Sequence, residues 1–352
     1  MLAVAVSITR VAQWATGATG RLALRAVIDS TDLELVGVRV YDPAKSGRDA
    51  GDLAGRARTG VRATDDNYEI VRAKPDVVLY MGSVERHPDS CFEDVAHLLS
   101  TGIDVIATGS SFVDVYGFDP DRASVIAAAC ADGGASFLGV GLFPGFWGEA
   151  VVPVLSRLSA GCDEIVVRES LSYAGYPSRE MMFDVMGYGH PPDATSPVLS
   201  DPQRAGQAFV ATARIIAKAL GLAISSCEPY RETAVTEREL EVASGVIPAG
   251  TVGAIKLGVR ADCGSTTIGV EHVTWMSPDV IPQWSRAEGY EIEFGGAPTL
   301  RCNLVLGTRG EDHTEMGCLA TAMHAVHAIP AVRQAPPGIF DLADLEFRGA
   351  VR

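Results

Sequence analysis

The chain has 352 residues, of which 47% are hydrophobic and 21% charged, and its net charge is −15. This composition indicates a globular protein rather than a disordered one, and the length suits two domains with separate cores. The negative charge disfavours nucleic acid as a partner. No apolar run is long enough to span a bilayer, and residues 1–10 look like a leader into the first strand. We therefore expect a cytoplasmic protein with no membrane partner.

The first 145 residues alternate between short apolar runs and helical segments. Strands are predicted at 9–16, 33–40, 76–81, 104–108 and 136–140. Helices are predicted at 21–30, 89–99 and 121–132. Strands that alternate with helices through short connections form parallel sheets covered by helices on both faces. The expected fold class is therefore α/β, with an N-terminal Rossmann domain built on a doubly wound parallel sheet.

The regular alternation of predicted strands and helices ends after residue 145. Long strands are predicted at 164–172, 254–261, 265–275, 290–294 and 299–306, and helices at 148–159, 178–187 and 203–220. A last helix runs from Thr314 to about Ile329 and stops before Pro330, where a loop begins. We expect an α+β domain with an open mixed sheet over 146–313, and a Rossmann domain over 1–145 that the C-terminal segment 314–352 joins.

A glycine pair lies between the first predicted strand and the helix that follows it. In Gly17-Ala18-Thr19-Gly20, the first glycine would let the backbone approach a diphosphate and the second would let helix and strand pack closely. The alternative is an ordinary tight turn. Two further pairs, Gly82-Ser83 and Gly109-Ser110, follow predicted parallel strands, the second of which ends at Thr108, at the sheet edge where a dinucleotide crosses. The sequence therefore predicts a nicotinamide dinucleotide site.

The residues after the second strand bear on the choice between NAD and NADP. A basic residue there favours the 2′-phosphate of NADP, and an acidic one favours the ribose of NAD. Arg39 ends the strand and Lys45 follows, although Asp42 is also near. We expect NADPH to be used at least as well as NADH.

Several stretches carry a resemblance to a known family. They are Gln13–Gly20, Gly47–Leu53, Ala107–Ser110, Pro144–Phe146, Glu271–Met276 and Thr321–Ala331. The chain resembles the dihydrodipicolinate reductase-like superfamily, and within it the branch of 2,4-diaminopentanoate dehydrogenase and native amine dehydrogenases. The His-His run and the Lys-Asp-Ala-Pro-Ser-Gly-Thr stretch of true dihydrodipicolinate reductases are absent.

The resemblance implies a homodimer formed through the open sheet and a last helix that packs on the first domain. It also implies a reaction, in which a ketone condenses with ammonium and the imine accepts a hydride from the nicotinamide. Two positions differ from the pattern of the branch. Ser110 and Ser111 stand where the branch has a glutamate that acts on the amine, and Phe143 stands where it often has an asparagine.

Hydride transfer needs an oriented substrate, a dry pocket and one group that manages the proton. Tyr173 and His272 are the candidate proton donors, and Ser110 is a candidate for placing a water or a polar group of the substrate. Packing roles are the alternative for both donors. Phe143 would border the nicotinamide, and Phe146, Trp147 and Tyr176 are candidate pocket residues.

Neither the cysteines nor any other motif predicts a metal site. The seven cysteines are scattered, form no Cys-x-x-Cys pair and have no histidine cluster beside them, which is typical of reduced thiols. Three functions stay open: an amine dehydrogenase or imine reductase, a carbonyl reductase that needs no ammonium, and an NADPH-binding protein without catalysis.

Overall fold

The computed structural model describes residues 8–200, 202–280, 284, 288–310 and 312–344. The residues before Ile8, which we expect to lead into the first strand, lie outside this description. The chain divides into two compact units, Met1–Phe146 with Arg309–Arg352, and Trp147–Thr308. No helix among the described residues is both long enough and apolar enough to span a membrane.

Unit 1 is a seven-stranded sheet in the order β15-β6-β5-β4-β1-β2-β3, and all its strand pairs are parallel. Its strands are β1 (Thr9–Trp14), β2 (Leu33–Arg39), β3 (Ala63–Thr64), β4 (Val77–Tyr80), β5 (Asp104–Thr108), β6 (Ser136–Val140) and β15 (Gly338–Phe340). Its helices are α1 (Ala18–Asp29), η1 (Pro43–Lys45), α2 (Ala50–Ala54), α3 (Asn67–Arg72), α4 (Pro88–Ser100), α5 (Ser110–Val113), α6 (Val115–Phe118), α7 (Pro120–Gly133) and α11 (His313–Val332). The predicted doubly wound Rossmann fold is confirmed.

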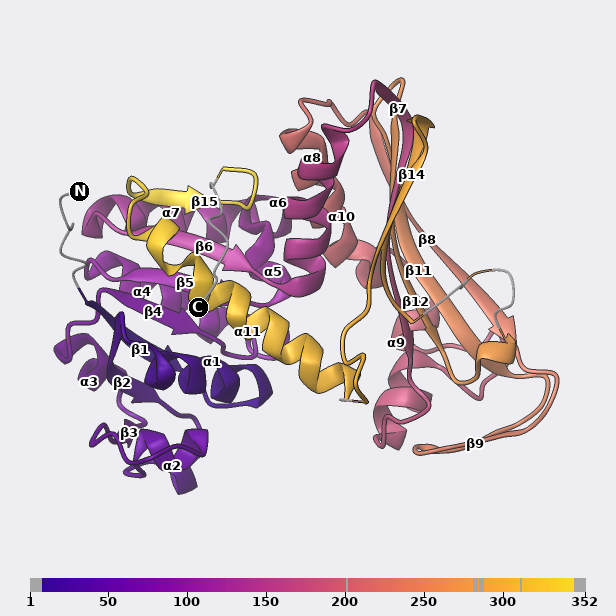
Figure 1. The fold of residues 1–352 in the computed structure, drawn as a ribbon. Helices are drawn as coiled ribbons and strands as arrows, with labels where there is room; N and C mark the ends of the chain where they lie inside the picture. Colours follow the sequence, from indigo (N-terminus) through magenta and orange to yellow (C-terminus); the bar gives the residue numbers. More distant parts are fainter. Residues whose placement is uncertain (1–7, 201, 281–283, 285–287, 311, 345–352) are drawn as a thin grey trace. The chain divides into compact units, whose positions relative to one another are not determined.

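Helices cover both faces of this sheet, as Figure 1 shows. Alternate residues of each central strand enter two different cores, so that Val78 packs with helices α4 and α7, and Val77 packs with α1 and α11. Strands that are buried on both faces must be apolar at nearly every position, and for this reason the sequence predicts them well. The expected packing of the last helix on this domain is also observed, and Arg333 Nη1 holds its end 2.6 Å from Asp104 Oδ2 at the start of β5.

Unit 2 is built on a six-stranded sheet in the order β14-β13-β7-β12-β11-β8. Its strands are β7 (Gly161–Ser172), β8 (Ser226–Val235), β11 (Val252–Asp262), β12 (Thr267–Trp275), β13 (Gly289–Ala297) and β14 (Leu300–Leu304), and β9 (Leu240–Val242) and β10 (Gly245–Ile247) form a separate hairpin. Its helices are α8 (Val151–Ser156), η3 (Glu180–Met186), α9 (Pro197–Ser200), α10 (Pro202–Ala219) and η4 (Pro278–Val280). Among the strand pairs that the structure describes in this sheet, only β7–β12 is parallel and the others are antiparallel. The sheet is therefore mixed, as predicted.

Helix α10 lies on one face of the unit 2 sheet. A Cβ atom added to Gly206 of α10 would approach Pro229 on β8 and Val259 on β11, which shows how close this packing is. Because side chains alternate along a strand, the face under α10 also includes Val270 and His272 of β12 and their register partners on β7.

Several elements differ from the sequence prediction. The predicted helix 148–159 is made up of the end of η2 (Leu142–Ala150), whose backbone is non-helical only at Phe143, Pro144 and Gly145, and of α8, which ends at Ser156. Strand β8 was not predicted; it contains Pro229 and many polar residues, a combination that only an edge strand tolerates.

The C-terminal region departs from prediction at two further points. The last helix does not stop before Pro330 but continues to Val332, because the Arg333 N–H still reaches the Ile329 carbonyl at 3.0 Å and the proline removes only one hydrogen bond. The loop predicted beyond it contains β15, a three-residue edge strand paired with β6 and too short to give an alternating pattern.

Candidate functional site

The turn between β1 and α1 has the geometry that the glycine pair predicts. Gly17 is the N-cap of α1, no side chain caps the helix there, and the first turn holds no acidic residue. A Cβ atom on Gly17 would meet no atom within 4 Å, whereas one on Gly20 would lie 2.2 Å from the Ala15 carbonyl oxygen. The turn therefore presents open backbone N–H groups at Gly17, Ala18 and Thr19 and requires a glycine at position 20, which suits a bound diphosphate.

The basic residues after β2 lie beside this turn. Lys45 Nζ is 3.2 Å from the Thr16 carbonyl oxygen. Arg39 donates to Asn67 Oδ1 at 2.5 Å, and its guanidinium lies 5.5 Å from the centre of the Trp14 ring and 4.8 Å from that of the Tyr41 ring. The carboxylate of Asp42, in contrast, accepts from the Ala44 N–H and caps η1.

A half-buried carboxylate that the sequence did not indicate, Asp94, holds Arg39 in place through Asn67. Asn67, the partner of Arg39, donates through Nδ2 to Asp94 Oδ1 at 2.8 Å. The hydroxyls of Tyr80 and Tyr41 lie 3.2 and 3.4 Å from Asp94 Oδ2. Burial raises the pKa of the Asp94 carboxyl above its usual range, against the lowering effect of these hydrogen bonds and of Arg39. Position 94 lies on an ordinary amphipathic helix, so no pattern in the sequence distinguishes it.

The ends of β4 and β5 bring Gly82, Ser83, Thr108 and Gly109 to the same edge of the sheet, as expected for neighbouring parallel strands. Ser110 begins the short helix α5, and its N–H donates to Glu85 Oε1 at 2.9 Å. The Ser110 hydroxyl lies 3.3 Å from the same oxygen. Glu85, in the loop after β4, was not predicted as a site residue, because an irregular loop carries no periodic signal.

In unit 2, the two predicted proton donors, Tyr173 and His272, lie close together, and Glu169 lies beside His272. The Tyr173 hydroxyl is 3.4 Å from His272 Nε2, and His272 Nδ1 is 2.7 Å from Glu169 Oε2. The side chains of His272 and Glu169 are only 14% and 12% exposed. Glu169 fixes Nδ1 as the protonated nitrogen and directs Nε2 toward the phenol. The sequence could not indicate Glu169, because its pairing with His272 depends on the register of two strands separated by 103 residues.

The surroundings of this cluster are largely apolar. The Phe209 ring lies 5.9 Å from the His272 ring with an angle of 25° between the planes. Burial raises the pKa of the Tyr173 phenol well above its usual range, and the charge of Glu169 adds to this effect. Tyr173 is therefore a protonated hydrogen-bond donor at neutral pH. The Tyr176 ring is 6.1 Å from that of Tyr173 and is 41% exposed.

The three candidate aromatic residues between positions 143 and 147 have separate surroundings. Phe143 lies in the irregular part of η2. The Phe146 ring contacts His324 of unit 1 edge-on, with 5.3 Å between centroids. Trp147 is buried and lies 6.3 Å from the Tyr290 ring within unit 2. Roles for these three residues in a pocket stay predictions.

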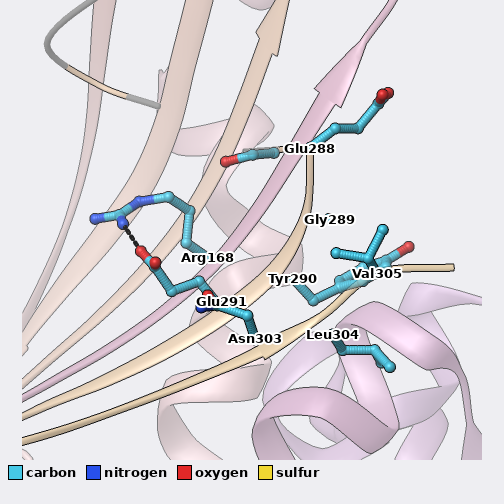
Figure 2. Close-up of a pocket in the computed structure, with 9 residues that line it drawn as sticks. Arg168, Glu288, Gly289, Tyr290, Glu291, Asn303, Leu304 and Val305 are labelled. Carbon is cyan, nitrogen blue, oxygen red and sulfur yellow. Dashed lines mark hydrogen bonds and ion pairs between the residues drawn. The ribbon is translucent and has the colours of Figure 1, made fainter. Parts of the chain in front are cut away.

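The opposite face of the unit 2 sheet carries a row of ion pairs. Arg168 donates to Glu271 at 2.6 Å and to Glu291 at 2.5 Å, and the Tyr230 hydroxyl donates to Glu271 at 2.6 Å. Burial acts to raise the pKa of the Glu271 carboxyl, but Arg168 and Tyr230 outweigh it and hold that pKa below its usual range. Figure 2 shows a small pocket on this side, in which Arg168 and Glu291 face each other. The pocket contains neither Tyr173 nor His272.

Comparisons with known proteins agree with this picture. Residues 181–352 match the family model of the 2,4-diaminopentanoate dehydrogenase C-terminal domain. The chain is 32% identical to an amine dehydrogenase from Streptomyces virginiae over 96% of each protein. It is similar in fold to the amine dehydrogenase from Mycobacterium smegmatis, with a TM-score of 0.74, 17% identity and 98% of each chain covered.

A more distant structural relative is biliverdin reductase from Synechocystis sp. PCC 6803, solved in complex with biliverdin and NADP+. Its TM-score is 0.50 with 10% identity, over 92% of this chain and 99% of that chain. This likeness concerns the fold alone.

Exchanging Gly17 for alanine tests the turn as a phosphate site. The new methyl group would touch no protein atom, so the thermal unfolding midpoint should not change. It would, however, occupy the space through which a diphosphate approaches the backbone, and NADPH affinity should fall about tenfold or more, or about 1.4 kcal/mol. Fluorescence titration with NADPH and thermal denaturation measure the two effects.

Gly20→Ala is the matched comparison for this test. Its methyl group would collide with the Ala15 carbonyl, so both the unfolding midpoint and the NADPH affinity should fall. An unaltered NADPH affinity in Gly17→Ala would show that no diphosphate binds at this turn.

Proposed function

Because the chain belongs to the amine dehydrogenase family, we propose that this oxidoreductase uses NADPH to aminate an aldehyde or ketone reductively. The reverse reaction is the oxidative deamination of the amine. The observation that carries the proposal is the Glu169–His272–Tyr173 cluster, a protonated donor beside a histidine whose tautomer is fixed. The apolar Phe209 next to it favours a small, apolar carbonyl substrate.

The cofactor part of the proposal is supported by the β1–α1 turn. Gly17, Ala18 and Thr19 would hold the diphosphate, and the space above Gly17 suits it. Lys45 and Arg39 would face the 2′-phosphate of NADP, while Asp42 is engaged in its own helix cap. When bound, the reduced nicotinamide would supply the hydride for the C=N carbon.

The residues of unit 2 would manage the proton of the carbonyl oxygen. Tyr173 donates a hydrogen bond to that oxygen, because its raised pKa keeps the phenol protonated. His272 relays a proton to Tyr173, and the carboxylate of Glu169 stabilises the imidazole as its charge changes. The nearby Phe209 limits the access of water to the pair.

Two further parts of the proposal concern assembly and location. We assign the face that carries Arg168, Glu271 and Glu291 to a homodimer interface, as the family resemblance implies; a molar mass of one chain in solution would contradict this.

We place the protein in the cytoplasm, where its seven unpaired cysteines would stay reduced.

Oxidation of NADPH against a panel of aldehydes and ketones, with and without ammonium, tests the reaction. We expect turnover that depends on ammonium and yields the amine. Equal turnover without ammonium would instead identify a carbonyl reductase. Stoichiometric NADPH binding with no turnover on any substrate would identify a binding protein without catalysis.

The cofactor preference is tested by Lys45→Ala. Loss of this ammonium group should weaken NADPH about tenfold and leave NADH affinity nearly unchanged, because only NADPH carries the 2′-phosphate. Arg39→Ala should act in the same direction. Arg58→Ala, which removes an exposed arginine paired with Asp52, is the control. Equal affinity of the wild type and both variants for the two cofactors would contradict the preference for NADPH.

The proton relay is tested by Tyr173→Phe, His272→Ala and Glu169→Gln. Each should lower kcat by more than about tenfold, an effect of about 1.4 kcal/mol on the barrier, since each removes one link between the solvent and the carbonyl oxygen. NADPH affinity should not change. The control is Tyr116→Phe, an exposed tyrosine of unit 1. Wild-type kcat in all three variants would assign the cluster to packing.

A further inference from the structure

A carboxylate outside the proton relay lies at the edge of the sheet where β4 and β5 end. Glu85 Oε1 accepts from the Ser110 N–H at 2.9 Å and lies 3.3 Å from the Ser110 hydroxyl. These two contacts use one oxygen of the carboxylate. No ion pair of Glu85 and no hydrogen bond to its Oε2 occurs among the residues that the structure describes. Glu85 is thus held at one oxygen and exposes the other.

The approach of Glu85 to the end of β5 is close. Gly109 has a φ angle of +129°, and a Cβ atom there would lie 2.5 Å from Val84 Cγ1 and 3.1 Å from Glu85 Oε1. A side chain at position 109 would push the loop that carries Glu85 away from Ser110. The glycine that we assigned to cofactor binding from the sequence therefore also makes room for this carboxylate.

The position of Glu85 matches the part of a dinucleotide that reacts. A dinucleotide lies across the carboxyl ends of the parallel strands, with its diphosphate at the β1–α1 turn. The adenosine half extends toward β2, where Arg39 and Lys45 lie, and the nicotinamide half extends toward β4 and β5. Glu85 is the one acidic residue in the loop 81–87 and the turn 109–113.

We propose that Glu85 binds the ammonium ion and accepts a proton from it, an assignment that rests on the proposed function. Ammonium is a cation with four N–H donors, and a carboxylate with one open oxygen and no cationic partner is a suitable acceptor. The Ser110 contacts keep the carboxylate in a fixed orientation, so the ion is bound in one place.

The proton transfers in this assignment balance. Ammonium gives one proton to Glu85, and the resulting lone pair forms the C–N bond at the carbonyl carbon. The nitrogen then gives up a second proton, and the His272–Tyr173 relay supplies one to the former carbonyl oxygen, which becomes a hydroxyl. The proton held by Glu85 joins this hydroxyl as the C–O bond breaks, so that water leaves, the iminium ion remains and Glu85 is again a carboxylate.

Glu85→Gln separates the charge from the hydrogen bonds. The glutamine carbonyl oxygen can still accept from Ser110, so the loop and the unfolding midpoint should not change. The KM for ammonium should rise about tenfold or more, and kcat should fall, because the amide neither attracts ammonium nor takes its proton. The KM for NADPH should stay the same. Glu93→Gln, an exposed glutamate on α4, is the matched control and should behave as the wild type.

The outcomes distinguish this assignment from the proposed function. Ammonium-dependent turnover in the wild type, together with wild-type ammonium kinetics in Glu85→Gln, overturns the role of Glu85 and leaves the reaction standing. A defect that appears in Glu85→Ala but not in Glu85→Gln also overturns it, because it assigns Glu85 to the cap of α5. Absence of ammonium-dependent turnover in the wild type overturns both. A raised KM for ammonium in Glu85→Gln alone supports the assignment.

Discussion

The candidate nucleotide-binding end of unit 1 depends on the close approach of helix α1 to strand β1. Only a glycine fits at position 20, where the Ala15 carbonyl oxygen leaves no room for a side chain. The same carbonyl accepts from the buried Gln13 side chain at 3.0 Å, and the Ala15 N–H donates to the Arg39 carbonyl at 2.9 Å. The turn is thereby joined to the end of β2. Lys45 continues this network through its contact with Thr16, so the packing of one glycine also positions the basic residues that we assign to the 2′-phosphate.

The register of β7 and β12 separates two kinds of chemistry on the same pair of strands. Glu169 lies opposite His272 on the face under α10, and Arg168 lies opposite Glu271 on the other face. On the first face, a carboxylate lies within hydrogen-bond distance of an imidazole beside a tyrosine. On the second, a guanidinium and carboxylates form a row of ion pairs. A shift by one residue would exchange the two faces, so this register is part of the candidate site.

The sequence revealed those parts of the molecule whose signal is local. Central strands buried on both faces appear as apolar runs, and the glycines at 17 and 20 follow from the turn that they form. The sequence did not indicate Glu169, Asp94 or Glu85 as site residues, because each is distinguished only by its contact with a residue on another element. The edge strands β8 and β15 were missed for a similar reason: each pairs on one side only, and neither shows the alternation of a half-buried strand. Tyr173 and His272 were found because their side chains alone suggest proton transfer, although their contact required the folded sheet.

The architecture of a parallel sheet also allows a carboxylate from one loop to lie beside a position where the family motif has a carboxylate and this chain has none. The resemblance implies a glutamate directly after β5, and this chain has Ser110 there. The carboxyl ends of adjacent parallel strands open onto one edge, so a side chain from the loop after β4 reaches the position that follows β5. Ser110 has no carboxylate of its own, but its N–H and its hydroxyl lie within hydrogen-bond distance of Glu85 and orient that carboxylate. A comparison of motifs position by position shows a missing negative charge at Ser110. In the folded protein, the carboxylate of Glu85 lies within one hydrogen bond of Ser110.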